Sequence, residues 1–171
     1  MMKIRFCLTN FIVETFSGAL NTLTKLHLSY PPYHHENLTL STFKQLCAEC
    51  VSLKTFRIEG LNTREDFWSH VSKLKKLENF HLGCVDSSFH ITPSAFEQIC
   101  TGCVCLKTLH LEGFETSENA LSHVSKLKQL EKFHLKRTRS SINMSSFRGW
   151  SSSNMKELCL DNLTEISLQV R

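Results

Sequence analysis

The chain has 171 residues, of which 41% are hydrophobic and 21% are charged, and its formal net charge at pH 7 is +4. This length fits one domain or one short repeat array, and the ordinary balance of apolar and charged residues argues against long disordered segments. The charge is too small to indicate nucleic-acid binding. Eight cysteines are an unusual number for a chain of this size, and they raise the question of disulfides, metal binding, catalysis or packing.

Neither a leader nor a membrane span is evident. No apolar run approaches the ~18 residues that a membrane-spanning helix needs. The stretch Met1–Phe6 contains a lysine and an arginine, but polar residues interrupt the following segment before an apolar signal-peptide core can form. We therefore expect no targeting signal, a cytoplasmic location and no insertion into a membrane.

An internal repeat of 53 residues dominates the sequence. Residues 53–82 and 106–135 match at 19 of 30 positions without a gap, and the similarity extends upstream to residues 42–51 and 95–104. Each copy holds two smaller units that begin with the spacing apolar-x-x-apolar-x-apolar. We expect each such unit to form a short strand with one buried face, followed by a helical stretch. The spacing starts seven times, at Met1, Leu23, Leu53, Leu77, Leu106, Leu130 and Met155.

Four helices are predicted between these strands, over residues 40–50, 64–74, 93–103 and 117–127, because apolar residues recur there at i, i+3 and i+4. Thr92 followed by Pro93 is typical of a helix start, and Thr63 and Thr116 are candidate caps of the two helices in the shorter units. The serine-rich stretch 139–154 predicts an irregular repeat. After it, the spacing that begins at Leu163 is too close for a helix and predicts a hairpin or an abbreviated turn.

This pattern resembles the leucine-rich-repeat family over essentially the whole chain. The resemblance implies an α/β solenoid, or horseshoe, in which residues 1–171 form a single array of about seven repeats, with short parallel strands on the concave side and helices on the convex side. Residues 91–113 are similar to the cysteine-containing and ribonuclease-inhibitor-like subtypes, which occur in NACHT-type innate-immune receptors and in F-box proteins. Because terminal repeats normally need a polar cap, we expect a fragment of a longer array with adjoining domains.

Two cysteine pairs, Cys47-x-x-Cys50 and Cys100-x-x-Cys103, have the spacing of zinc ligands. They occupy equivalent positions two repeats apart, however. Strands that stack about 4.8 Å apart would separate the pairs by about 10 Å, which is too far for one tetrahedral zinc with sulfur bonds of about 2.3 Å. We therefore predict that these cysteines pack in the core as small apolar residues.

A column of basic residues is predicted on the outward side of the strands, where alternate side chains point away from the core. The central outward positions hold Arg5, His27, Arg57, His81, His110, His134 and Cys159. Because leucine-rich arrays usually bind through this face, we predict that it contacts a protein partner of acidic character and no nucleic acid. We expect the stacked charges to lower the pKa of the histidines and keep them mostly neutral at pH 7. The predicted contact residues are Arg5, His27, Arg57, His81, His110, His134, Lys132, Lys136 and Glu112.

Two further chemistries were weighed against this binding role. A metal held by His81, His110 and His134 is conceivable, but no carboxylate or fourth ligand is evident, so we predict no metal site and no cofactor. The repeated Ser-His pairs at 69–70 and 122–123 resemble part of a catalytic triad, but adjacent helical residues diverge by about 100°. We predict no catalytic residues and no enzyme.

The predicted function is a protein–protein interaction module. In the resemblance, it corresponds to the sensing or autoinhibitory region of an intracellular NACHT-type innate-immune receptor. The alternative is the substrate-recruiting array of an F-box-type ubiquitin ligase.

Overall fold

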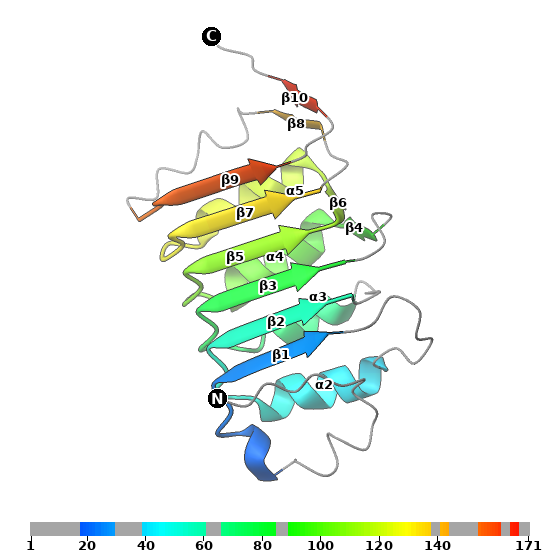
Figure 1. Ribbon diagram of the computed structural model, residues 1–171, viewed down its shortest axis with the longest axis vertical. Helices are drawn as coiled ribbons and strands as arrows, with labels where there is room; N and C mark the ends of the chain where they lie inside the picture. Colours follow the sequence, from blue (N-terminus) through cyan, green and yellow to red (C-terminus); the bar gives the residue numbers. More distant parts are fainter. Residues whose placement is uncertain are drawn as a thin grey trace.

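The computed structural model describes residues 18–29, 39–60, 66–84, 89–137, 141–143, 154–161 and 165–167. Within these residues, six parallel strands form one sheet in the order β1-β2-β3-β5-β7-β9, so that strands from successive repeats lie side by side (Figure 1). The strands are β1 (Lys25–Ser29), β2 (Thr55–Glu59), β3 (Asn79–Gly83), β5 (Thr108–Glu112), β7 (Lys132–Lys136) and β9 (Glu157–Asp161).

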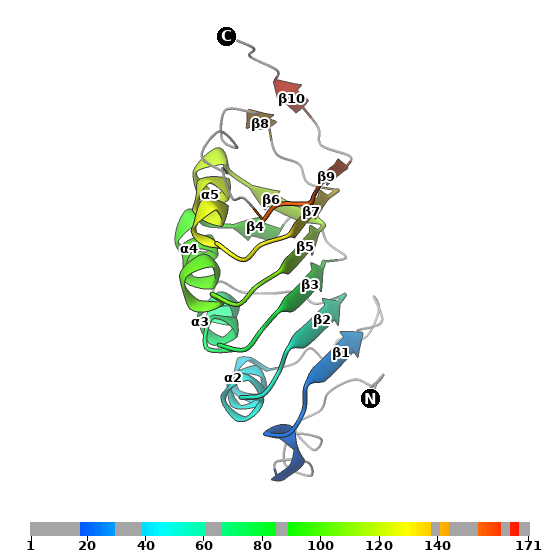
Figure 2. The same cartoon turned by 90° about the vertical axis from the view of Figure 1, so that its left-hand side faces the viewer.

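The helices all cover one side of this sheet and leave its other side open (Figure 2). Those of the long repeats, α2 (Leu40–Glu49) and α4 (Pro93–Gly102), confirm the predicted ranges to within one residue. The helices of the short repeats are shorter than predicted. They are α3 (Asp66–Val71) and α5 (Glu118–Ser122), and α5 continues as the 3-10 helix η1 (His123–Lys126). These units have fewer residues in which to return to the sheet, and a 3-10 turn, which rises about 2.0 Å per residue, covers the distance with fewer of them.

Side-chain caps begin the helices of the long repeats. The hydroxyl of Thr92 accepts a hydrogen bond from the backbone N–H of Ala95 at 3.2 Å, which confirms the predicted start of α4, and Thr39 caps α2 in the same way. The prediction for Thr116 is wrong. This residue is buried in a strand, and the next hydroxyl along the chain, that of Ser117, caps α5. Thr63 lies outside the described residues.

The core lies between the sheet and the helices. The sheet register aligns one apolar row, Leu26, Phe56, Phe80, Leu109, Phe133 and Leu158, and a second row two residues further along each strand. The rings of Phe43 and Phe67 stack at 4.3 Å and join α2 to α3. Burying a side chain of this kind contributes about 1.5–3 kcal/mol, so the repeated apolar rows are the main source of stability.

The four cysteines of the two Cys-x-x-Cys segments are buried and unpaired, which confirms the predicted packing role. Burial raises the pKa of Cys50 and of Cys103 to about 12 and raises the pKa of Cys47 and Cys100 as well. The Cys103 thiol also donates a hydrogen bond to the Val71 carbonyl at 3.4 Å, which ties α4 to α3. These thiols are therefore held as neutral apolar groups.

Two pairs of short parallel strands, which the repeat spacing does not predict, complete the described fold. β4 (Phe89–Ile91) pairs with β6 (Phe114–Thr116), and β8 (Ser141–Asn143) pairs with β10 (Glu165–Ser167). The parallel pairing of β10 favours the abbreviated turn over a hairpin. The predicted first repeat at Met1 lies outside the described residues. Among the described residues, no helix is both long and apolar enough to span a bilayer.

Candidate binding face of the strands

The open side of the six-stranded sheet, here called the strand face, carries the predicted basic column. The sheet register places the central outward residues next to one another in consecutive strands, and Arg5 lies outside the described residues. The alternating burial along each strand turns the apolar residues toward the helices and these residues toward the open side. The aligned residues are His27, Arg57, His81, His110, His134 and Cys159.

The histidines of the column shield one another from solvent. The ring centroids of His81 and His110 are 4.1 Å apart, and those of His110 and His134 are 5.3 Å apart. The side chain of His81 is only 16% exposed and that of His110 only 18%, whereas the Arg57 side chain is 46% exposed. Adjacent parallel strands lie close enough for these tilted rings to contact one another, so repeating a histidine in consecutive strands also buries it.

Burial changes the pKa of the two central histidines. Burial, followed by the charges of His110 and Arg57, lowers the pKa of His81 to about 4. Burial, followed by the charge of His134, also lowers the pKa of His110. The predicted direction is confirmed for both residues, although burial outweighs like-charge repulsion as the cause. The ring of His81 is therefore neutral at pH 7, and the shift at His110 favours the neutral form as well.

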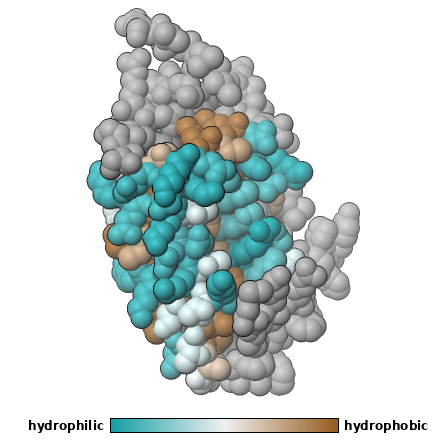
Figure 3. Space-filling view, turned by 60° about the vertical axis from the view of Figure 1, so that its left-hand side comes forward, coloured by the Kyte–Doolittle hydropathy of each residue, from teal (hydrophilic) through white to brown (hydrophobic). Residues whose placement is uncertain are grey.

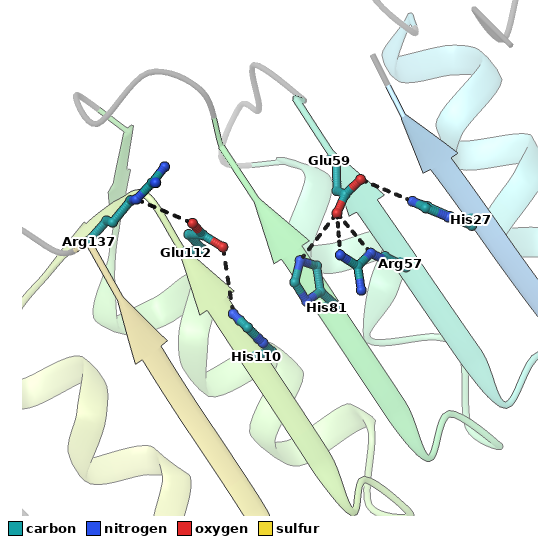
Figure 4. A network of polar contacts seen from close by, with 7 residues as sticks. All are labelled: His27, Arg57, Glu59, His81, His110, Glu112 and Arg137. Carbon is teal, nitrogen blue, oxygen red and sulfur yellow. Dashed lines mark hydrogen bonds and ion pairs between the residues drawn. The ribbon is translucent and has the colours of Figure 1, made fainter. Parts of the chain in front are cut away.

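Carboxylates interleave with the basic column at one end. Glu59 accepts a hydrogen bond from Arg57 Nε at 2.9 Å, lies 3.2 Å from His27 Nε2, and is 3.9 Å from His81 Nε2 (Figure 4). Burial opposes the ionisation of Glu59, but the hydrogen bonds from Arg57 and His27 outweigh it and hold its pKa below the ordinary value. This carboxylate therefore joins three strands.

The same arrangement recurs further along the face. Glu112 lies between Arg137, whose Nε is 3.5 Å from Oε1, and His110, whose Nε2 is 3.7 Å from Oε2 (Figure 4). On β9, Glu157 lies 2.7 Å from Lys132 Nζ and 3.0 Å from His134 Nε2. The predicted residue Lys136 aligns with Glu112 and Asp161 in the register. The described part of the face is thus a mosaic of paired charges rather than a purely basic stripe.

One expectation from the sequence is wrong. No carboxylate was expected near the histidines, yet His81, His110 and Glu112 each offer a ligand atom within 4.8 Å of the other two. Residues two apart on a strand share a face, so the pattern His110-x-Glu112 could have revealed this neighbour. His134, the third histidine considered in the sequence, is not part of this group.

In the Ser-His pair at 122–123, the two side chains contact different groups. Ser122 donates its hydroxyl hydrogen bond to the Asn119 carbonyl at 2.7 Å, one turn back along α5, while His123 lies 4.0 Å from a carboxylate oxygen of Glu97. The serine hydroxyl therefore bonds to the helix backbone, and the neighbouring imidazole does not activate it as a nucleophile. This geometry favours a structural role for the pair.

No family model and no curated protein match the sequence. Among solved structures, the chain is similar to an internalin from Listeria monocytogenes, with a TM-score of 0.54 and 14% sequence identity over 89% of this chain and 46% of that one. The fold is a leucine-rich-repeat solenoid. This solenoid confirms the predicted fold class. At this identity the likeness concerns the fold alone, and the chain spans less than half of the internalin chain.

Proposed function

We propose that this solenoid is a protein–protein interaction module and that the strand face, the concave face in such a fold, contacts the partner. The observation that carries this proposal is the continuous column of aligned histidines and Arg57 on the side of the sheet that the described helices leave open (Figure 2). The other side of the sheet, by contrast, is covered by the helices and the core. A rigid sheet holds its outward side chains at fixed spacing, which favours recognition of a matching surface.

The partner that fits best is acidic. Arg57 and Lys132 carry positive charge on the strand face. Each is paired with a glutamate of the same face and remains about half exposed. Exposed pairs of this kind contribute only about 0–1 kcal/mol, so carboxylates of a partner can replace the internal ones at small cost. Side chains such as Lys25, at the exposed start of β1, would add to the attraction and speed association.

The visible surface also favours polar recognition. Figure 3 shows that the side on which the strands begin is mostly hydrophilic, with hydrophobic colours confined to small areas. Among the described residues, the exposed large apolar side chains are scattered over the array rather than gathered on the strand face: Leu40, Val51, Val104 and Leu158. Charge pairing and hydrogen bonds would therefore supply most of the specificity.

Site-specific photo-crosslinking tests which face binds. A photoreactive residue at Lys25 or Lys132 lies on the strand face, whereas one at Gln98 or Lys126 lies on the helix side, and all four positions are exposed. In cells that express the intact protein, we expect a discrete protein adduct from the strand positions and none from the helix positions. Adducts formed only from the helix side would contradict the proposal.

We further propose that the parent protein is an intracellular NACHT-type receptor in which this array senses a ligand or holds the receptor inactive. The support is the similarity of residues 91–113 to the repeats of such receptors. The sequence of the full-length transcript tests this context. A nucleotide-binding segment of the form GxxxxGK[ST] upstream supports it, and an F-box helical segment in that place would instead indicate a ubiquitin ligase.

A further inference from the structure

The central part of the strand face brings together two imidazoles and one carboxylate. His81 comes from β3, and His110 and Glu112 come from the adjacent β5, where the register pairs His81 with His110 and Gly83 with Glu112. One ligand atom of each of the three side chains lies within 4.8 Å of the other two. Three donors from two paired strands of a rigid sheet form a site whose backbone is already in place.

The distances within this group fit a bridging ion better than a direct hydrogen bond. His110 Nε2 and Glu112 Oε2 are 3.7 Å apart, which is longer than the usual range of about 2.7–3.2 Å for N–H···O hydrogen bonds. Two ligands at about 2.0–2.1 Å from a tetrahedral ion are about 3.4 Å apart. All spacings in the group are within 4.8 Å, so they exceed this by about 1.4 Å at most, a gap that rotation of partly exposed side chains about χ1 and χ2 can close.

His110 Nε2 has a further property of a ligand atom. It is buried and makes no hydrogen bond among the described residues, although a buried polar atom without a partner is costly. An imidazole with its proton on Nδ1 carries on Nε2 the lone pair that a metal requires. A metal ion would satisfy this nitrogen and the facing carboxylate oxygen together.

One position beside the three donors carries no side chain. Gly83 lies next to Glu112 in the register and has no side chain, and His81 Nε2 lies 3.7 Å from the place where a Cβ on Gly83 would be. His81 therefore extends over Gly83, which the register places between Glu59 and Glu112. An ion above Gly83 would meet backbone and donor atoms rather than an apolar side chain.

The neighbours of the group orient it and balance its charge. Arg137 pairs with Glu112 Oε1 and leaves Oε2 directed at His110, as a second layer of contacts does in many metal sites (Figure 4). Arg57 and Lys136 add positive charge that opposes cation binding, since both act on these histidines. The Glu59 carboxylate, 3.9 Å from His81, offsets part of it.

We propose that His81, His110 and Glu112 bind a divalent transition-metal ion of the zinc class on the strand face. Two imidazoles and one carboxylate are a ligand set that zinc accepts, and a fourth position filled by water completes a tetrahedral site. This inference does not depend on the identity of any protein partner.

Titration of the reduced protein with Co²⁺ tests the proposal, because tetrahedral cobalt absorbs visible light and thiolate ligands add a charge-transfer band in the near ultraviolet. We expect one equivalent of Co²⁺ to produce the visible bands without the thiolate band. Added Zn²⁺ should displace the Co²⁺ and remove the visible bands. Glu112→Gln and His110→Ala should each weaken binding by at least about tenfold, since even the loss of an outer contact costs about 10–100-fold. His27→Ala, in the same column but outside the group, should bind as the unmodified protein does.

Three results would overturn the proposal. These are the lack of visible bands with the unmodified protein, the appearance of the thiolate band in their place, and equal affinity of the unmodified protein and the Glu112→Gln variant. Glutamine has nearly the size of glutamate, and a circular dichroism spectrum identical to that of the unmodified protein shows that the variant is folded. A loss of binding in that variant then reports on the ligand and not on the fold.

Discussion

Single side chains in this solenoid take their chemistry from the neighbours that the repeat gives them. An imidazole that would be a surface group on an isolated strand lies against another, tilted ring in the column, and burial lowers the pKa of His81 to about 4. The same spacing places Cys103 beneath the sheet, where burial raises the pKa of its thiol to about 12. Position in the array therefore determines reactivity.

The buried cysteines should be unreactive in the folded protein. During alkylation with iodoacetamide at pH 8, we expect Cys50 and Cys103 to react at least about a thousandfold more slowly than an ordinary thiol, because a pKa of about 12 leaves very little thiolate. Peptide mass spectrometry measures the rates, with the partly exposed Cys105 and Cys159 as internal references. In urea all four should react alike, and equal rates in the native protein would contradict the assigned burial.

At the scale of the elements, α3 and α4 approach each other closely where α4 ends. A Cβ on Gly102, at the end of α4, would lie 2.4 Å from the backbone oxygen of Ser72, which follows α3. The glycine therefore permits the approach of the two helices. A backbone oxygen cannot move aside as a flexible side chain can.

Gly102→Ala should lower the free energy of unfolding by about 1–3 kcal/mol, because the overlap with Ser72 outweighs the better helix propensity of alanine. Urea unfolding followed by circular dichroism measures the change. Gly18→Ala is the matched control, since nothing lies within 4 Å of a Cβ at that glycine. A stability of Gly102→Ala at or above that of the unmodified protein would show that the helices are further apart than described.

The elements also show where sequence reasoning succeeds. The spacing apolar-x-x-apolar-x-apolar predicted the strands and, through the constant phase of the repeat, the alignment of His81 with His110. The Ser117 cap and the 3-10 turn were missed because they depend on the path of the backbone and not on periodicity. The position of Glu112 beside His110 was missed because a side chain reaches along its strand, a dimension that a repeat alignment does not describe.

For the whole molecule, stability is distributed along one direction. Each repeat contacts mainly its neighbours, so a residue in the middle of the array is covered on both sides and one at the edge strand on only one. Leu109 and Leu158 illustrate this, because they occupy the same apolar row of the sheet. Leu109 is fully buried, whereas Leu158 on β9 is 41% exposed.

Leu109→Ala should therefore cost about 2–5 kcal/mol of unfolding free energy, and Leu158→Ala about 1 kcal/mol or less, although the substitution is the same. Urea unfolding of the two variants gives both values. Similar losses at the two positions would mean that β9 is covered as fully as β5, contrary to its exposure.

The central claim is that the strand face is the surface that binds a protein. Once photo-crosslinking has identified the partner, its Kd for the double variant His110→Ala/His134→Ala tests the claim directly. The double variant Lys126→Ala/Lys128→Ala on the helix side is the control. We expect the first variant to bind at least about tenfold more weakly, a loss of about 1.4 kcal/mol, and the control to bind within about twofold of the unmodified protein. Unchanged binding by a folded His110→Ala/His134→Ala variant would contradict the claim.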